Sequence, residues 1–167
     1  MEFILPTENN REDVLSFYTE IEESGGECIG FGNYKEYDLW LSGMQKRFAG
    51  KDLPEGYVRE NFYLCYDKEI LIGVFSLKFT LTQSLLNFGG HIGYAVRPSE
   101  RNQGWAIQIL KQGLTPAKQF NFDRVLCVCD EDNYGSEKVI LKNGGVLENT
   151  LYDPDEKVVV KRYWIHL

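Results

Sequence analysis

The spacing of apolar residues changes along the chain, and this change constrains the fold more than any other feature of the sequence. Up to Gly50 the apolar residues recur every three or four positions, as on the buried face of a helix. From Tyr57 onward they fall into short runs rich in aromatic and branched residues, as in strands. Two later segments return to helical spacing. Such an order is typical of the α+β class.

The same pattern predicts one three-layered domain, residues 1–167, in which helices cover both faces of a mixed sheet. Thr115-Pro116 predicts a kink in, or a restart of, the helix that Gly104 opens. The predicted elements are, in chain order, strand 3–5, a helix that stops at Gly25-Gly26, a helix that starts after Asn33 and stops before Gly50, a hairpin of strands 61–66 and 70–81, strand 91–96, the helix from Gly104, strand 124–129, a helix from Asn133 to Gly144, and a hairpin of strands 146–151 and 157–166.

The charge and the apolar runs exclude some classes of partner. The formal net charge is −7 and no cluster of Lys and Arg is present, so we expect no nucleic-acid partner. We find no signal-peptide pattern and no apolar stretch near the roughly 20 residues of a membrane helix. We therefore expect a cytoplasmic protein with no membrane partner.

The four cysteines are dispersed along the chain, and we expect free thiols. Cys127 and Cys129 lie in an apolar run that reads as a buried strand, which explains them without a metal. A redox or metal module built on these two residues is the alternative.

A turn between a strand and a helix carries the strongest chemical signal. The start of a helix offers free N–H groups and a favourable dipole to a phosphate group. Gly104 lets the backbone approach closely, Ala106 leaves the next turn uncrowded, and Arg101 adds a charge-assisted contact. Taken alone, such a turn also occurs as a plain strand-to-helix connection.

The residues around this turn resemble a known family. Residues 89–106, which read GGHIGYAVRPSERNQGWA, resemble the signature motif of the GNAT superfamily of N-acetyltransferases, including its Q/R-x-x-G-x-G/A loop. Residues 132–136 and 143–146 are similar to its second signature region. The resemblance spans nearly the whole chain, and within the superfamily it is to a branch of predicted bacterial acetyltransferases with GGHIGY before the loop. It implies a GNAT-like three-layer fold, acetyl-CoA as cosubstrate and no metal.

The resemblance also implies a set of binding residues. Tyr94, Ala95 and Val96 would lie beside the pantetheine arm, and Asn133 and Ser136 would lie near the thioester. Asn133 is equally a typical N-cap of the helix that it precedes, and both roles stay open. The diphosphate would be wrapped by Arg101, Asn102, Gln103, Gly104, Trp105 and Ala106.

In this family a neutral amine attacks the thioester directly, which requires a base and an oxyanion donor. The N–H of Ala95 or Val96 is the candidate donor. His91 is the candidate base, because it begins the same strand and titrates near neutrality. Strand alternation places His91 with Gly93 and Ala95 on one face. A hydrogen-bonded structural histidine is the alternative.

The candidate acid departs from the family pattern. Many relatives place a Tyr seven residues after the helix-leading Asn, and this chain has Ile140 there. Tyr134 and Ser136 are the remaining catalytic candidates on this helix. A thiol with a pKa of roughly 8.5 also leaves without a dedicated acid.

We therefore expect an N-acetyltransferase that acts on a primary amine of a small molecule or a protein. A degenerate module that only senses acyl-CoA is the alternative, motivated by Ile140. A homodimer through a sheet edge or the C-terminal hairpin is compatible with the sequence. Four aromatic residues are candidates either for an acceptor pocket or for the core: Phe31, Tyr37, Trp40 and Tyr57.

Overall fold

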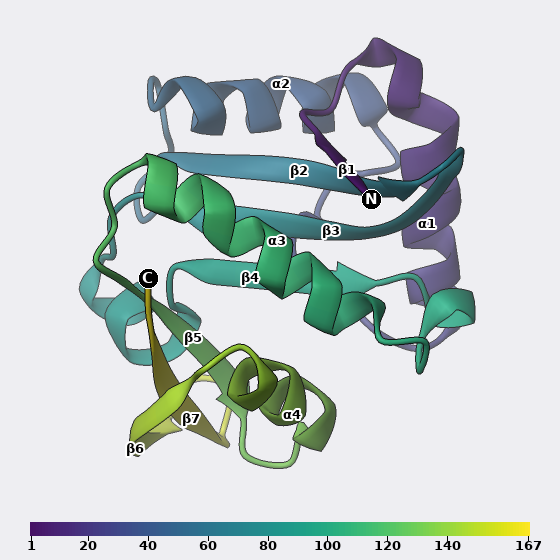
Figure 1. The fold of residues 1–167 in the computed structure, drawn as a ribbon. Coiled ribbons are helices and arrows are strands. Elements are labelled where there is room, and N and C mark those ends of the chain that lie inside the picture. The colour runs from purple at the N-terminus through teal and green to yellow at the C-terminus, as the bar shows by residue number, and fades with distance from the viewer.

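The computed structural model describes residues 1–167, which form a seven-stranded mixed sheet in the order β1-β2-β3-β4-β5-β7-β6 (Figure 1). All neighbouring strands are antiparallel except the parallel pair β4–β5. The strands are β1 (Glu2–Ile4), β2 (Glu60–Asp67), β3 (Ile70–Lys78), β4 (Ile92–Val96), β5 (Arg124–Asp130), β6 (Val146–Asp153) and β7 (Val158–His166). The helices are α1 (Arg11–Glu23), α2 (Tyr37–Ala49), α3 (Trp105–Gln119) and α4 (Tyr134–Lys142), with short helical turns at Glu8–Asn10, Leu85–Gly89 and Pro98–Glu100.

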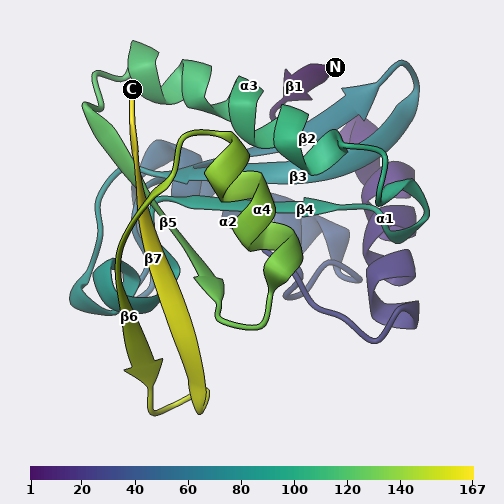
Figure 2. The ribbon, with the colours of Figure 1, turned by 60° about the horizontal axis from the view of Figure 1, so that its bottom comes forward.

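The helices lie on both faces of the sheet, which confirms the predicted three-layer α+β class (Figures 1 and 2). Helices α1 and α2 pack on β2 and β3 through one apolar cluster, whose largest members include Phe17, Tyr18 and Tyr37. Helices α3 and α4 pack on the opposite face through a second cluster, which joins β3 and β4 to β5 and β7. No helix is long and apolar enough to cross a membrane.

The helical periods predicted from the sequence are the buried faces of the structure. In α1 the buried residues recur at three- and four-residue steps from Val14 to Ile21. Helix α2 begins at Tyr37, later than predicted, because Asn33 has a left-handed backbone (φ 59°) and residues 32–36 form turns. Gly50, with φ 66°, ends this helix as predicted.

Three further predictions differ from the structure. Helix α3 runs unbroken through Pro116, so Thr115 does not restart it. Proline removes one N–H from the helix, but Gly113 and Ala117 pack into the core on either side of it and keep the segment helical. Strand β3 ends at Lys78 instead of residue 81, and residues 85–89, predicted as an irregular link, form a helical turn.

The parallel pair β4–β5 is joined only at its beginning. A single residue pair, Ile92 with Cys127, is in register. Just before it, the His91 N–H donates to the Leu126 carbonyl at 2.8 Å. Beyond it β4 and β5 no longer pair, whereas β5 pairs with β7 along its whole length. We call this unpaired part of the two strands the β4–β5 fork; in Figure 1, β5 turns steeply away from β4 there.

Candidate active site

The β4 side of the fork presents backbone groups that do not pair with a neighbouring strand. The Lys78 N–H donates to the His91 carbonyl and the Arg97 N–H donates to the Ile72 carbonyl, both at 2.8 Å. Along an antiparallel pair, the backbone N–H and C=O groups of successive residues point alternately toward the partner strand and away from it. The backbone groups of Ala95 therefore also point to β3, whereas those of Tyr94 and Val96 point to the fork. Of the two candidate oxyanion donors, Val96 is therefore the one whose N–H points toward β5.

The segment between β4 and α3, residues 97–104, forms a loop at the end of the fork. Arg101, Asn102, Gln103 and Gly104 are exposed, and the loop turns through left-handed backbone at Asn102 (φ 64°) and Gly104 (φ 84°). A β-carbon at Gly104 would meet no atom within 4 Å, so this position favours glycine because of its φ and not because of crowding. Helix α3 starts at once after it, with its first N–H groups free for a ligand.

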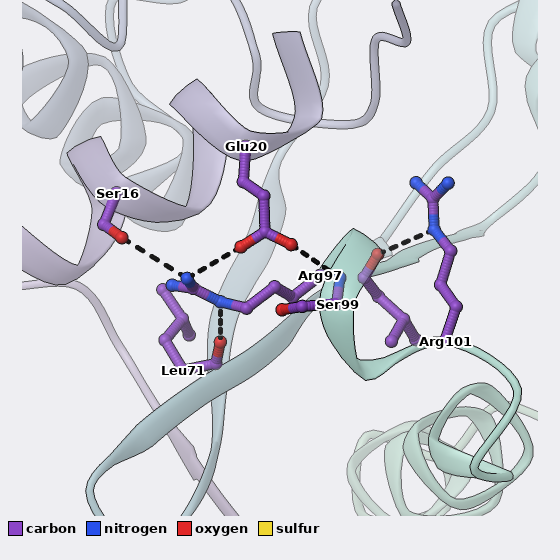
Figure 3. Close-up of polar contacts among 7 residues, drawn as sticks. Ser16, Glu20, Leu71, Arg97, Ser99 and Arg101 are labelled. Carbon is purple, nitrogen blue, oxygen red and sulfur yellow. Dashed lines mark hydrogen bonds and ion pairs between the residues drawn. The ribbon is translucent and has the colours of Figure 1, made fainter. Parts of the chain in front are cut away.

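The side chains of this loop differ in how firmly they are held. Arg101 Nε donates to the Val96 carbonyl at 3.3 Å, while its guanidinium forms no ion pair and keeps terminal N–H groups available (Figure 3). Trp105 and Ala106 pack partly against the core below α3. The predicted diphosphate residues thus lie together where β4 ends, and they combine free backbone donors with one free cation.

A pair of hydroxyl groups, one from β4 and one from α4, meets below the fork. Tyr94 Oη lies 2.8 Å from Ser136 Oγ and donates to the Ser136 carbonyl at 3.3 Å. Burial raises the pKa of Tyr94, so its hydroxyl stays protonated. The Asn133 side chain accepts a hydrogen bond from the Ser136 N–H at 3.0 Å, which shows that Asn133 caps α4. The structure therefore brings Tyr94, Asn133 and Ser136 together.

The other candidates on α4 do not join this cluster. Tyr134 is 73% exposed and forms no side-chain hydrogen bond. Ile140 is 1% exposed and belongs to the core, so its position offers no hydroxyl. The Tyr94 hydroxyl instead reaches α4 one turn before Ile140. The sequence analysis placed Tyr94 only beside the pantetheine arm, because no local pattern reveals a hydrogen bond across 42 residues.

His91 lies at the closed end of the fork. Its Nδ1 accepts a hydrogen bond from the Leu126 N–H at 2.9 Å, and its ring packs edge-on against Phe122. Burial, with a smaller contribution from Lys78, lowers the pKa of His91 to about 4. His91 is therefore neutral at pH 7 with one nitrogen engaged, a setting that suits a structural histidine and makes a weak base.

Of the four predicted pocket aromatics, Trp40 supports the segment at residues 28–31 and Phe31 belongs to it. Tyr37 and Trp40 are buried in the α1–α2 core, whereas Tyr57 is half exposed and stacks under Arg47. Trp40 Nε1 donates to the Gly30 carbonyl at 2.6 Å, and Tyr18 Oη donates to that of Ile29 at 2.8 Å.

Ile29 in turn packs over β4, where a β-carbon on Gly93 would lie 2.6 Å from Ile29 Cγ2. Phe31, which is partly exposed, stacks near Tyr18. The side chains of Tyr18 and Trp40 thus hold segment 28–31 against one face of β4.

The cysteines and a cleft beside α3 lie apart from this chemistry. Burial raises the pKa of Cys127 to about 12 and that of Cys129 to about 11, so both thiols stay protonated. No group of three His, Cys, Asp or Glu side chains is arranged to hold a metal ion. A cleft of about 630 Å³ lies between α3 and the end of α4, and none of the predicted site residues lines it; three of its residues are Lys111, Lys118 and Lys142.

Residues 6–146 match the family model described as "Acetyltransferase (GNAT) domain". No curated protein gives a significant match. Among solved structures, RimL, a ribosomal L7/L12 α-N-protein acetyltransferase in complex with coenzyme A, is similar with a TM-score of 0.75 at 18% identity, covering 99% of this chain and 93% of that chain.

Two further structures have the same fold. The microcin C7 self-immunity acetyltransferase MccE, in complex with acetyl-CoA and AMP, has a TM-score of 0.73 at 15% identity, covering 99% of this chain and 91% of that chain. The ribosomal-protein-S5-alanine acetyltransferase from Vibrio fischeri also has a TM-score of 0.73 at 15% identity, covering 98% and 91%.

Proposed function

Because this chain belongs to the GNAT acetyltransferase family, we propose that it transfers an acetyl group from acetyl-CoA to a primary amine of a small molecule or a protein. The observation that carries the proposal is the β4–β5 fork. The fork ends in a loop that has two residues with left-handed backbone and that leads directly into the 15-residue helix α3. An unpaired strand edge can form hydrogen bonds with the amide groups of an extended arm such as pantetheine. The free N–H groups at the start of a helix can bind a diphosphate.

The residues of the fork divide the binding of the donor between them. The backbone groups of Tyr94 bind the pantetheine arm as an added strand edge, and the Val96 N–H is left for the thioester because the Val96 carbonyl accepts from Arg101. Arg101 and the free N–H groups around Gly104, Trp105 and Ala106 bind the diphosphate. Two of the similar structures contain CoA or acetyl-CoA, which supports the same donor here. The narrower resemblance to the bacterial branch with GGHIGY remains part of the proposal.

The transfer forms an N–C bond, breaks the C–S bond, removes a proton from the attacking nitrogen and gives a proton to the sulfur. The Val96 N–H stabilises the negative charge that develops on the thioester oxygen. The hydroxyls of Ser136 and Tyr94 donate to the departing sulfur. These two hydroxyls provide the general acid that many relatives carry as a Tyr at the position of Ile140. Catalysis is therefore favoured over the sensor function.

The acceptor is an amine that arrives from the side of segment 28–31. Similar structures include acetyltransferases of ribosomal proteins and of spermidine, which supports both protein and small-molecule amines as candidates. An acidic chain with net charge −7 also attracts cationic amines.

Release of free thiol from acetyl-CoA, measured with peptide N-termini, lysine and polyamines, tests the proposal. We expect at least one amine to increase thiol release well above the rate without amine. Binding of CoA without turnover on any amine would favour the sensor function. Absence of any CoA or acetyl-CoA binding would show that the proposal is wrong.

A further inference from the structure

The first residue of the 97–104 loop is held by two distant elements (Figure 3). Arg97 Nε donates to the Leu71 carbonyl of β3 at 2.9 Å. Arg97 Nη1 reaches α1, where it lies 3.0 Å from Glu20 Oε2 and 3.3 Å from Ser16 Oγ. The guanidinium also lies 5.8 Å from the centre of the Phe17 ring. Arg97 therefore fixes the point at which the chain leaves β4.

The Glu20 carboxylate holds a second point of the same loop. Its Oε1 accepts a hydrogen bond from the Ser99 N–H at 2.5 Å, while its Oε2 pairs with Arg97. The side chains of Arg97 and Glu20 are 15% and 27% exposed, so solvent screens this pair less than a surface pair. Burial opposes ionisation of Glu20, but the hydrogen bonds from Ser99 and Arg97 outweigh it and lower the pKa of Glu20.

The remainder of the loop has few ties of its own. Within it, the Glu100 and Arg101 N–H groups donate to the carbonyls of Arg97 and Pro98, and Gln103 bonds to Glu100. From Arg101 to Gly104 the loop is exposed and turns twice through left-handed backbone. Such a segment loses conformational freedom when it closes on a ligand, unless it is already ordered.

We propose that Glu20 and Arg97 are positioning residues, which hold the 97–104 loop in its diphosphate-binding conformation before the donor arrives. This inference rests on the proposed function. Neither side chain contacts the fork, so both act through the backbone of the loop. Helix α1 also leads into segment 28–31. Glu20 and Arg97 therefore connect the 97–104 loop to the side of the sheet from which the acceptor is proposed to arrive.

The test compares two ligands that share an arm and differ in the diphosphate. Calorimetry measures the Kd of CoA, and NMR titration measures the Kd of pantetheine, for the wild type and for Glu20→Gln. We expect Glu20→Gln to weaken CoA binding about tenfold, as loss of a charge-assisted hydrogen-bond pair does. The affinity for pantetheine should stay within twofold, because pantetheine does not reach the loop.

Other variants separate positioning from general damage. Glu22→Gln on the same helix removes the exposed ion pair with Lys35, and CoA binding should not change. Arg97→Gln should weaken CoA binding as much as Glu20→Gln, and the double variant should weaken it hardly further, because both changes release the same loop. Glu20→Asp, which keeps the charge, should bind CoA more tightly than Glu20→Gln. Unfolding curves report whether each variant folds.

Each outcome decides one of two questions. If the wild type binds CoA and Glu20→Gln and Arg97→Gln bind it equally well, the positioning inference is wrong while the proposed function stands. If these variants weaken CoA and pantetheine binding by the same factor, the pair has only a structural role and the inference again is wrong. If the wild type does not bind CoA, the proposed function fails, and the inference fails with it.

Discussion

At the scale of single residues, the hydroxyl pair below the fork is where catalysis is tested first. Ser136→Ala and Tyr94→Phe each remove one hydroxyl from the pair. We expect each to lower turnover about tenfold, less than the usual effect of a general acid because a thiolate is a fair leaving group. CoA affinity should remain near that of the wild type.

Tyr134→Phe is the matched control, because its hydroxyl belongs to the same helix but is exposed and unbonded. Thiol-release kinetics and CoA titration report the two quantities. Full turnover in both Ser136→Ala and Tyr94→Phe would show that the sulfur leaves without these hydroxyls.

His91 gives a prediction about stability and pH. Burial and Lys78 lower its pKa to about 4, whereas the unfolded chain titrates near 6.5. Between these values the unfolded state binds more protons, so the free energy of unfolding falls as the pH decreases from about 6.5 to about 4. His91→Asn keeps an acceptor for the Leu126 N–H and removes the titration. Urea unfolding at pH 7 and pH 5 should show a smaller pH-dependent loss in His91→Asn than in the wild type.

Turnover measurements complete the test of His91. If His91 has only a structural role, His91→Asn also keeps the wild-type pH profile of turnover. A large loss of turnover with CoA affinity retained would instead support the predicted role of His91 as the base.

At the scale of elements, the strand–loop–helix unit from β4 to α3 is tested through its glycine. Gly104 has φ 84°, and an alanine there is strained by roughly 1–2 kcal/mol. Gly56 has φ 83° and is equally uncrowded, so Gly56→Ala introduces similar strain far from the loop. We expect both variants to lose similar stability, while only Gly104→Ala weakens CoA binding, by about tenfold. Equal CoA affinity in the two variants would contradict a role for this loop.

The sequence predicts an element well where its signal is local. The apolar period of α1, the Asn133 cap of α4 and the position of the loop before α3 all follow from residues within a few positions of one another. The course of α3 through Pro116 depends on packing against a sheet whose strands are distant in sequence. The helical turn at 85–89 has no apolar period and shows no local signal.

The candidate site was predictable to the same extent. Residues 94–96 and 101–106 lie close in sequence and meet as expected. Other features depend on contacts between residues that are tens of positions apart. They are the hydrogen bond between Tyr94 and Ser136, the hydrogen bond that Glu20 accepts from the loop, and the divergence of β4 from β5. No single-sequence pattern specifies such contacts, so the proposed acid and the proposed positioning pair rest on contacts that only the structure shows.

At the scale of the whole molecule, the fork predicts how the ligand affects stability. Strands β1–β4 are joined to strands β5–β7 by one backbone residue pair. CoA bound in the fork would add hydrogen bonds to β4. CoA at one hundred times its Kd should raise the free energy of unfolding by about 2.7 kcal/mol. For a domain of this size, we expect the melting temperature to rise by roughly 5–10 °C. Differential scanning calorimetry with increasing CoA measures this shift.

Hydrogen exchange locates the same effect along the chain. The amides of residues 94–106 should exchange more slowly in the complex, while those of α2, on the opposite side of the sheet, should not change. Slower exchange in α2 alone, or no rise in melting temperature at saturating CoA, would contradict binding in the fork.

The single pair Ile92–Cys127 also has a mechanical consequence. The strands β1–β4 and the strands β5–β7 share this short stretch of backbone pairing, and the second apolar cluster packs across both groups. We expect the two groups of strands to rotate slightly about this pair, because no other strand pairing joins them. In the proposed reaction, such a rotation would widen the end where β4 and β5 are unpaired and give the product thiol an exit that breaks no strand pairing.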